Sequence, residues 1–115
     1  MGYRIEYAVR GGTMQARVSG KSSLAYAARI ARDIAEEAAQ RAAKQLLIDV
    51  RGLVDRVGTL GTLALGACGP ARVALVDTVD NDRWHILSEG LARSRGYALR
   101  CFNDRDSAID WLQGR

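Results

Sequence analysis

The chain has 115 residues and a net charge of +4, and 48% of its residues are hydrophobic. This is the composition of one globular domain with a single core, and it excludes a disordered chain. No apolar run approaches the ~20 residues that a membrane-spanning helix needs. Charges at Arg4, Glu6 and Arg10 argue against a signal peptide. We therefore expect residues 1–115 to form one cytoplasmic domain without membrane insertion.

The charged and metal-binding residue types disfavour several functions. The 17 basic residues are scattered among 13 acidic ones instead of forming a patch, which disfavours nucleic-acid binding. Cys68 and Cys101 are too few for a disulfide scaffold or a zinc site, and we expect both to be buried thiols. His85 is the only histidine and lacks the neighbours that catalysis needs, so we expect a surface or capping role. The sequence predicts no metal and no cofactor.

The chain opens with the pattern of a β-hairpin. Large apolar residues alternate with charged ones over residues 3–9, as in a half-buried strand. Gly11 and Gly12 follow and suit a tight turn, because glycine accepts a positive φ. Residues 13–19 alternate again, and the members of their expected buried face are Met14, Ala16 and Val18.

A long amphipathic helix is predicted next, capped by Ser22 or Ser23. Apolar residues recur at spacings of three and four over residues 24–42, which places them on one face. The expected buried stripe consists of Leu24, Ala27, Ala28, Ala31, Ile34, Ala35, Ala38 and Ala42.

The rest of the chain alternates strands with helices. Residues 46–50 are continuously apolar, which is typical of a central parallel strand buried on both faces. We expect a charged turn after Asp49 and then a helix from about residue 56 to Gly69-Pro70. The remaining predicted elements are a strand at 71–77, a helix at 82–95, a strand at 97–102 and a closing helix capped by Asn103 or Asp104, with Ala108, Ile109, Trp111 and Leu112 as its apolar face.

The resulting order, β-β-α-β-α-β-α-β-α, predicts an α/β fold. Strand–helix–strand units give parallel pairing, so we expect a mixed five-stranded sheet that is opened by the antiparallel hairpin and covered by helices. In such sheets the carboxyl ends of the parallel strands meet at one edge, where ligands and partners bind.

Polar residues gather where the predicted strands end. The first cluster is Asp49-Val50-Arg51 with Asp55-Arg56, the second is Asp77-Thr78 with residues 81–85, and the third is Asn103-Asp104. Either these side chains line a shared cleft, or they cap turns and helices and pair with nearby arginines. The candidate interaction or ligand-binding residues are Asp49, Arg51, Asp55, Arg56, Gly58, Thr59, Thr62, Asp77 and Trp84.

The C-terminal third carries a set of residues that resembles a known family. The members of this set are Arg95-Gly96, Arg100, Phe102, Asp104, Ala108 and Trp111-Leu112. With these residues the chain resembles the SpoIIAA-like branch of the STAS domains, the anti-sigma-factor-antagonist fold.

The resemblance implies a switch region that this chain has altered. STAS antagonists carry a phosphorylatable serine in an Asp-Ser-Ser-Gly motif, and the matching stretch here is Asp55-Arg56-Val57-Gly58. Both serines are absent, so the serine switch does not carry over. Thr59 and Thr62 are either alternative phosphate acceptors or local hydrogen-bonding residues.

Three functional hypotheses remain open. The first is a non-enzymatic, STAS-like regulatory or protein-interaction module that binds a protein partner through residues 51–62. Such a module could also form a homodimer. The second is a small-molecule, lipid or anion carrier with a cleft between the helix at 56–65 and the sheet. The third is an enzyme that uses Asp49, Asp55 or Asp77, although no catalytic arrangement is visible in the sequence.

Overall fold

The computed structural model describes residues 2–21, 23–54, 72–78, 82–94, 96 and 98–114. The helix predicted at 56–69 lies outside this part of the chain. The described elements are β1 (Tyr3–Arg10), β2 (Thr13–Lys21), α1 (Leu24–Gln40), β3 (Gln45–Val54), β4 (Arg72–Val76), α3 (Asp82–Ser94), β5 (Leu99–Phe102) and α4 (Arg105–Leu112).

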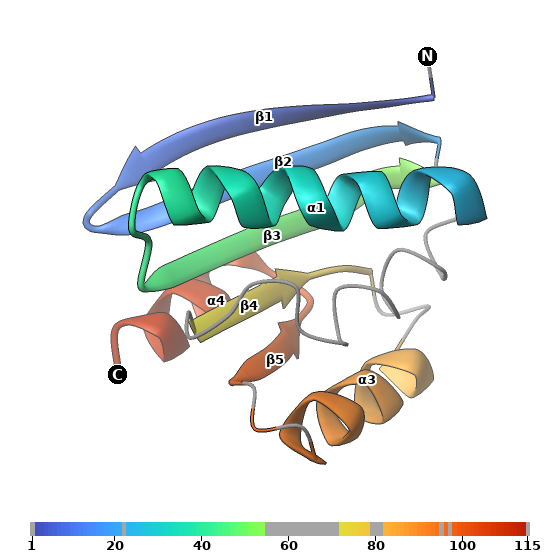
Figure 1. The fold of residues 1–115 in the computed structure, drawn as a ribbon. Helices are drawn as coiled ribbons and strands as arrows, with labels where there is room; N and C mark the ends of the chain where they lie inside the picture. Colours follow the sequence, from blue (N-terminus) through green and yellow to red (C-terminus); the bar gives the residue numbers. More distant parts are fainter. Residues whose placement is uncertain are drawn as a thin grey trace.

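The described strands form one five-stranded mixed sheet in the order β1-β2-β3-β4-β5 (Figure 1). β1 and β2 are antiparallel, and each later strand is parallel to its neighbour. The hairpin turn consists of Gly11 and Gly12 with φ values of 57° and 81°. Two successive positive φ values are typical of a type I′ turn, whose twist matches that of the strands. The predicted α/β class and antiparallel opening are confirmed.

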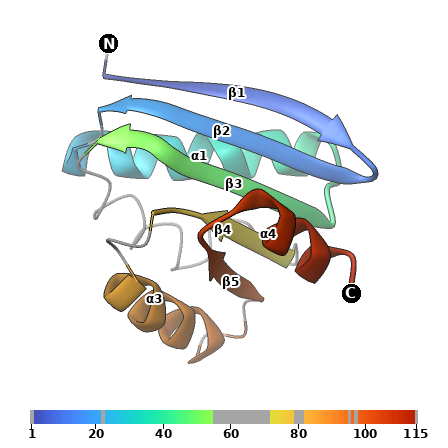
Figure 2. The same cartoon turned by 180° about the vertical axis from the view of Figure 1, so that it is seen from behind.

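Helices cover the two faces of the sheet unequally (Figures 1 and 2). α1 buries its apolar side on a large cluster that includes Val18, Ile48 and Leu75. α4 packs on the opposite face, where Ala108 and Leu112 contact a smaller cluster. α4 contacts β3, β4 and β5, whereas the same face of β1 and β2 is left open by the described helices.

The side chain of Ser23 caps α1 by accepting a hydrogen bond from the backbone N–H of Tyr26 at 3.2 Å. The predicted stripe is correct for Ala27, Ala31, Ile34 and Ala38, which are all buried. Of the other predicted members, Ala28 is exposed, Ala35 is half-buried and Ala42 lies beyond the helix. Ile30, which the predicted stripe does not include, is fully buried. Ala42 adopts a φ of 49°, a left-handed conformation that does not continue an α-helix.

β3 extends further than predicted. The stretch after Asp49 was expected to turn, but residues 51–54 continue the strand and pair with the end of β2. Between the pairs Arg17–Asp49 and Ser19–Gly52, β3 contains one residue more than β2, so the strand carries a β-bulge. The bulge shifts the alternation of side chains by one position, and Leu53 therefore joins the core beneath α1.

The C-terminal elements follow the prediction with small changes. β5 begins at Leu99 instead of residue 97, and α3 packs beside it. Asp104 is the N-cap of α4, one of the two residues expected in this role. Cys101 is half-buried, not fully buried as expected, because it lies on the short edge strand β5. Cys68 lies outside the described residues.

Candidate functional site

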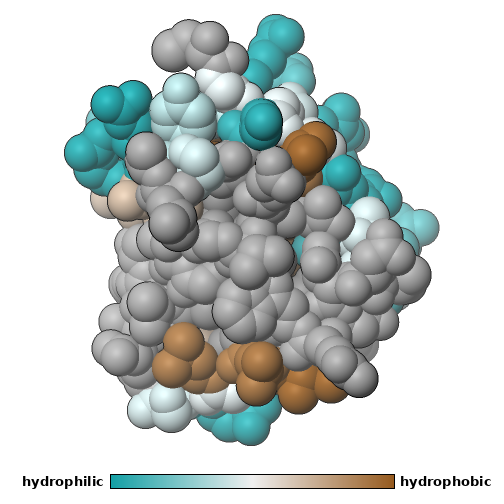
Figure 3. Space-filling model, turned by 90° about the vertical axis from the view of Figure 1, so that its right-hand side faces the viewer, coloured by the Kyte–Doolittle hydropathy of each residue, from teal (hydrophilic) through white to brown (hydrophobic). Residues whose placement is uncertain are grey.

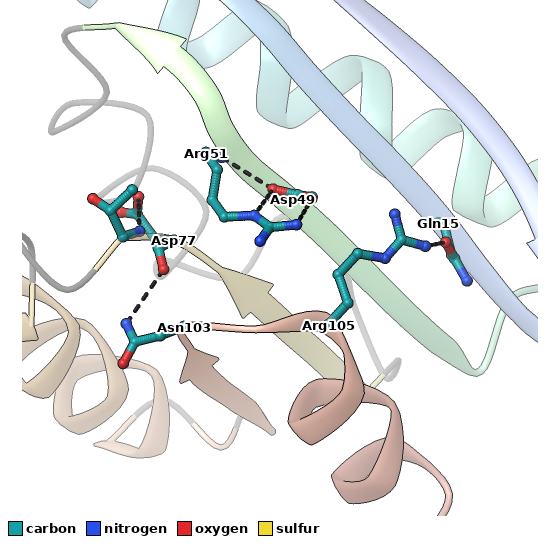
Figure 4. Close-up of polar contacts among 7 residues, drawn as sticks. Gln15, Asp49, Arg51, Asp77, Asn103 and Arg105 are labelled. Carbon is teal, nitrogen blue, oxygen red and sulfur yellow. Dashed lines mark hydrogen bonds and ion pairs between the residues drawn. The ribbon is translucent and has the colours of Figure 1, made fainter.

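Polar groups meet at the carboxyl ends of β3, β4 and β5, which share one edge of the sheet because the strands are parallel. Figure 4 shows the side chains of this edge together with Gln15 of β2 and Arg105 of α4. Asp49 and Arg51 belong to β3, Asp77 follows β4, and Asn103 follows β5. All three polar clusters of the sequence therefore contribute to this edge.

Asp49 and Arg51 form an ion pair on the same strand. The Nη2 and Nε atoms of Arg51 lie 2.8 and 3.1 Å from the two carboxylate oxygens of Asp49, and the backbone N–H of Arg51 donates to the same carboxylate at 3.1 Å. Asp49 is only 5% exposed. Burial acts to raise the pKa of Asp49, but the hydrogen bonds from Arg51 outweigh it and lower the pKa.

Arg51 lies within the β-bulge of β3, between the pairs Arg17–Asp49 and Ser19–Gly52. A regular strand would direct its N–H groups into the pairing with neighbouring strands, whereas a bulge leaves one residue outside that ladder. Here the N–H of Arg51 bonds to the Asp49 side chain. Bulges often occur next to functional sites, where they redirect a side chain.

Asp77 joins the ends of β4 and β5. Its backbone N–H donates to the carbonyl of Phe102 at 2.9 Å, and its own carbonyl accepts from Nδ2 of Asn103 at 3.3 Å. Its carboxylate accepts from the backbone N–H of Thr78 at 2.7 Å, and the residue is fully buried. Asp77 therefore organises the loop connections at this edge.

Asp104 is the N-cap of α4 and directly follows Asn103 of the same edge. Its carboxylate accepts from the backbone N–H of Ser107 at 2.7 Å and from the Ser107 hydroxyl at 3.0 Å. Both bonds lower the pKa of Asp104, and the bond from the backbone N–H has the larger effect. The positive charge of Arg51 also lowers this pKa. Arg51 is thus close enough to influence two carboxylates, one on β3 and one at the start of α4.

Two residues that were not among the predicted candidates complete the polar surface. A guanidinium nitrogen of Arg105 on α4 donates to Oε1 of Gln15 on β2, as Figure 4 shows. Arg105 also lowers the pKa of Asp49 through its charge. Gln15 is 8% exposed, and it lies opposite the apolar face of its strand. No local pattern indicates this contact, because the two residues are 90 positions apart in the sequence.

An open cavity of about 520 Å³ adjoins this surface on the uncovered half of the sheet. Its charged lining residues are Glu6, Arg10, Arg17, Asp49 and Arg105. Charges of both signs suit a hydrated groove better than a pocket for an apolar ligand. This cavity is not the predicted cleft beside residues 56–65, which lies outside the described part of the chain.

The remaining candidate residues are not placed by the structure. Asp55, Arg56, Gly58, Thr59 and Thr62 all lie outside the described residues. Trp84 is on α3, whose backbone is described, but its side chain is outside the description, as is that of His85. Of the candidate set, the structure therefore brings together Asp49 and Arg51, with Asp77 at the same edge.

The chemistry of the described edge is that of salt bridges, caps and loop hydrogen bonds. Within the described ranges, no three His, Cys, Asp or Glu side chains gather in a way that could hold a metal ion. Among those same ranges, no helix is long and apolar enough to cross a membrane.

The ion pair between Asp49 and Arg51 agrees with the alternative in which these acids pair with nearby arginines.

No protein-family model matches the chain, and no curated protein matches it significantly. Among solved structures, the chain is similar to an anti-sigma factor antagonist from Mycobacterium paratuberculosis. The TM-score is 0.69 at 19% sequence identity, over 97% of this chain and 95% of the other. The fold expected from the STAS resemblance is therefore confirmed. The chain has the α/β fold of an anti-sigma factor antagonist.

Proposed function

We propose that the chain is a non-enzymatic, STAS-like regulatory module that binds a protein partner at the carboxyl edge of its sheet. The surface, here called the carboxyl-edge surface, comprises Arg51, Val54 and Asn103 together with Ile86 and Leu87 of α3. The predicted interaction residues at 55–62 follow Val54 directly in the chain. The similar structure is named for antagonism of an anti-sigma factor, which is itself a protein. The shared fold over almost the whole chain supports the same kind of activity here.

The observation that carries this proposal is the exposed apolar side of α3. Ile86 and Leu87 are 72% and 64% exposed, and Val54 at the end of β3 is 58% exposed. Figure 3 views the molecule from the side towards which β2, β3 and β4 point, and hydrophobic residues of α3 lie along the lower rim of that face. Large apolar side chains that are exposed to this extent are typical of protein-binding surfaces.

The polar part of the edge supports the same conclusion. The carboxylate of Asp49 forms an ion pair with Arg51, and the carboxylate of Asp104 caps α4. Groups held in this way shape a surface and fix its charges, whereas a general acid or base needs a carboxylate that can exchange its proton with a substrate. We therefore favour partner binding over catalysis by Asp49.

A photo-crosslinking amino acid at Ile86 or Val54 tests the proposal inside the native cells. We expect both positions to form a discrete adduct with one other protein, identified by mass spectrometry. Val9 is the matched control, because it is also an exposed apolar residue, at 54%, but lies at the hairpin end of β1. Adducts with the same protein at Val9, or no heterologous adduct at Ile86 and Val54, would contradict the proposal.

A further inference from the structure

The outer edge of β1 is a long strand edge that no described strand covers. β1 comprises eight residues and is the first strand in the sheet order, with β2 as its only neighbour in the described part of the chain. The opposite edge, β5, comprises four residues and has α3 beside it. Open strand edges present unpaired N–H and C=O groups, which can pair with another strand.

The hairpin determines which backbone groups of β1 face this edge. In a two-residue type I′ hairpin the flanking residues, Arg10 and Thr13, bond to each other, and every second residue along β1 repeats this orientation. At the other end of the strand, the Gly2 carbonyl accepts from the Lys21 N–H, which agrees with this alternation. The residues whose backbone groups face outward are therefore Tyr3, Ile5, Tyr7 and Val9.

The side chains of β1 separate by face in the same alternation. Tyr3, Ile5 and Tyr7 are half-buried on the α1 side, where they pack against the core. Arg4 and Glu6 are exposed on the opposite side. A groove of about 460 Å³ runs along the edge on the α1 side, so the edge is accessible there.

We propose that β1 pairs antiparallel with β1 of a second copy of the chain, about a two-fold axis that passes beside Ile5. The outward backbone groups of Ile5 then bond to those of Ile5 in the second copy, as a hydrogen-bonded pair requires. Tyr3 lies opposite Tyr7 of the second copy, and Arg4 lies opposite its Glu6. The five-stranded sheets of both copies become one continuous sheet.

Charge complementarity favours this register. The two-fold axis repeats each cross-strand pair, so the dimer contains two Arg4–Glu6 pairs in the close, non-hydrogen-bonded positions. An axis beside Arg4 or Glu6 would instead place like charges directly opposite each other. An axis beside Ala8 would pair Glu6 with Arg10, but the hairpin turn at Gly11 would end the pairing sooner.

Charge-swap variants of the full chain test the proposal by light scattering over a range of protein concentrations. We expect Arg4→Glu and Glu6→Arg each to weaken self-association about tenfold or more, because each creates two like-charge pairs. An equimolar mixture of the two variants should form a heterodimer, since the acidic strand of one variant then faces the basic strand of the other. Recovery on mixing also shows that both variants are folded.

Arg10→Glu is the matched control, because it makes the same charge change on the same face of β1 but outside the paired segment. We expect it to self-associate as the wild type does. The proposal is overturned if the wild type stays monomeric up to its solubility limit, or if it dimerises and Arg4→Glu has no effect. Disruption by Arg10→Glu alone would overturn the register beside Ile5.

Amide hydrogen exchange provides a residue-level readout. The outward N–H groups of Ile5 and Tyr7 should be protected in the wild-type dimer and should exchange rapidly in the Arg4→Glu variant. The inward N–H groups of Glu6 and Ala8 should be protected in both, because β2 covers them. Equal exchange at Ile5 and Tyr7 in the two proteins would contradict the proposal. This test does not depend on the carboxyl-edge surface, which lies elsewhere on the sheet.

Discussion

Arg51 covers the carboxylate of Asp49 from two positions further along the same strand, with nitrogen–oxygen distances of 2.8 and 3.1 Å. The two partners differ in exposure, since the Asp49 side chain is 6% exposed and that of Arg51 is 39% exposed. A buried charge depends on its partner more than an exposed one does. The buried carboxylate on β3 therefore depends on a partly exposed guanidinium group for its stabilisation.

Replacing Arg51 with methionine should reveal this dependence. We expect Arg51→Met to lower the free energy of unfolding by about 1–2 kcal/mol, which is less than the ~3–5 kcal/mol for breaking a fully buried pair because Arg51 is partly exposed. The double variant Asp49→Asn/Arg51→Met should lose less than the sum of the two single changes. Urea unfolding measures both, and Arg29→Met on the exposed side of α1 is the control. Strict additivity would argue against the pair.

The lowered pKa values of Asp49 and Asp104 predict a loss of stability in acid. Each carboxyl has a pKa below its ordinary value of 3.8 in the folded protein, so the unfolded chain binds protons first as the pH falls. This contribution to stability is present above about pH 4 and is lost as the pH falls through the lowered pKa values.

Asp104→Asn isolates one of these carboxyls, because asparagine is also a good N-cap but does not titrate. We expect the variant to keep α4 intact at neutral pH and to lose stability less steeply than the wild type below about pH 4. Urea unfolding at several pH values measures this difference. The same acid slope in both proteins would show that Asp104 has an ordinary pKa.

Tyr7 predicts a change at the other end of the pH scale. Burial, followed by the negative charges of Glu37 and Asp33, raises the pKa of Tyr7 from 10.0 to about 12. A raised pKa means that the contribution to stability is present below pH 10 and is lost as the pH rises through about 12. In a titration followed by phenolate absorbance, Tyr7→Phe should remove one late-titrating group. If Tyr7→Phe instead removed a tyrosine that titrates near the ordinary pKa of 10.0, the raised pKa of Tyr7 would be contradicted.

The packing of α1 offers a test of which residues form its buried side. We expect Ile30→Ala to cost about 2–5 kcal/mol of unfolding free energy, because the side chain is fully buried. Ala28→Ser should change it by less than about 0.5 kcal/mol, because Ala28 is exposed. Thermal or urea unfolding distinguishes the two. Similar losses for both would place the buried side of the helix differently.

The architecture was predictable from the sequence because periodicity and turn residues are local signals. The alternation before Gly11 and the continuous apolar run at Leu46 identified two strand types correctly. The extension of β3 was missed because Arg51-Gly52 has the composition of a turn, and only pairing with β2 keeps it extended. Local patterns do not contain that partner.

The site was less predictable than the fold for the same reason. The pairing of Asp49 with Arg51 could be anticipated, because two residues apart on a strand share a face. The contact between Gln15 and Arg105 joins the second strand to the last helix, and no spacing rule connects them. The alanine pattern of α1 fits more than one helical face, so spacing alone does not identify Ile30 as part of the buried side.

The central claim is that the carboxyl-edge surface binds a protein partner. The most direct test is to measure the affinity of purified variants for the partner that crosslinking identifies. The account predicts that Ile86→Lys weakens the affinity about tenfold or more, since a charge would replace an apolar contact at the interface. Val9→Lys, which alters an equally apolar exposed residue elsewhere, should bind as the wild type does. Undiminished binding by both Ile86→Lys and Val54→Lys would contradict the account.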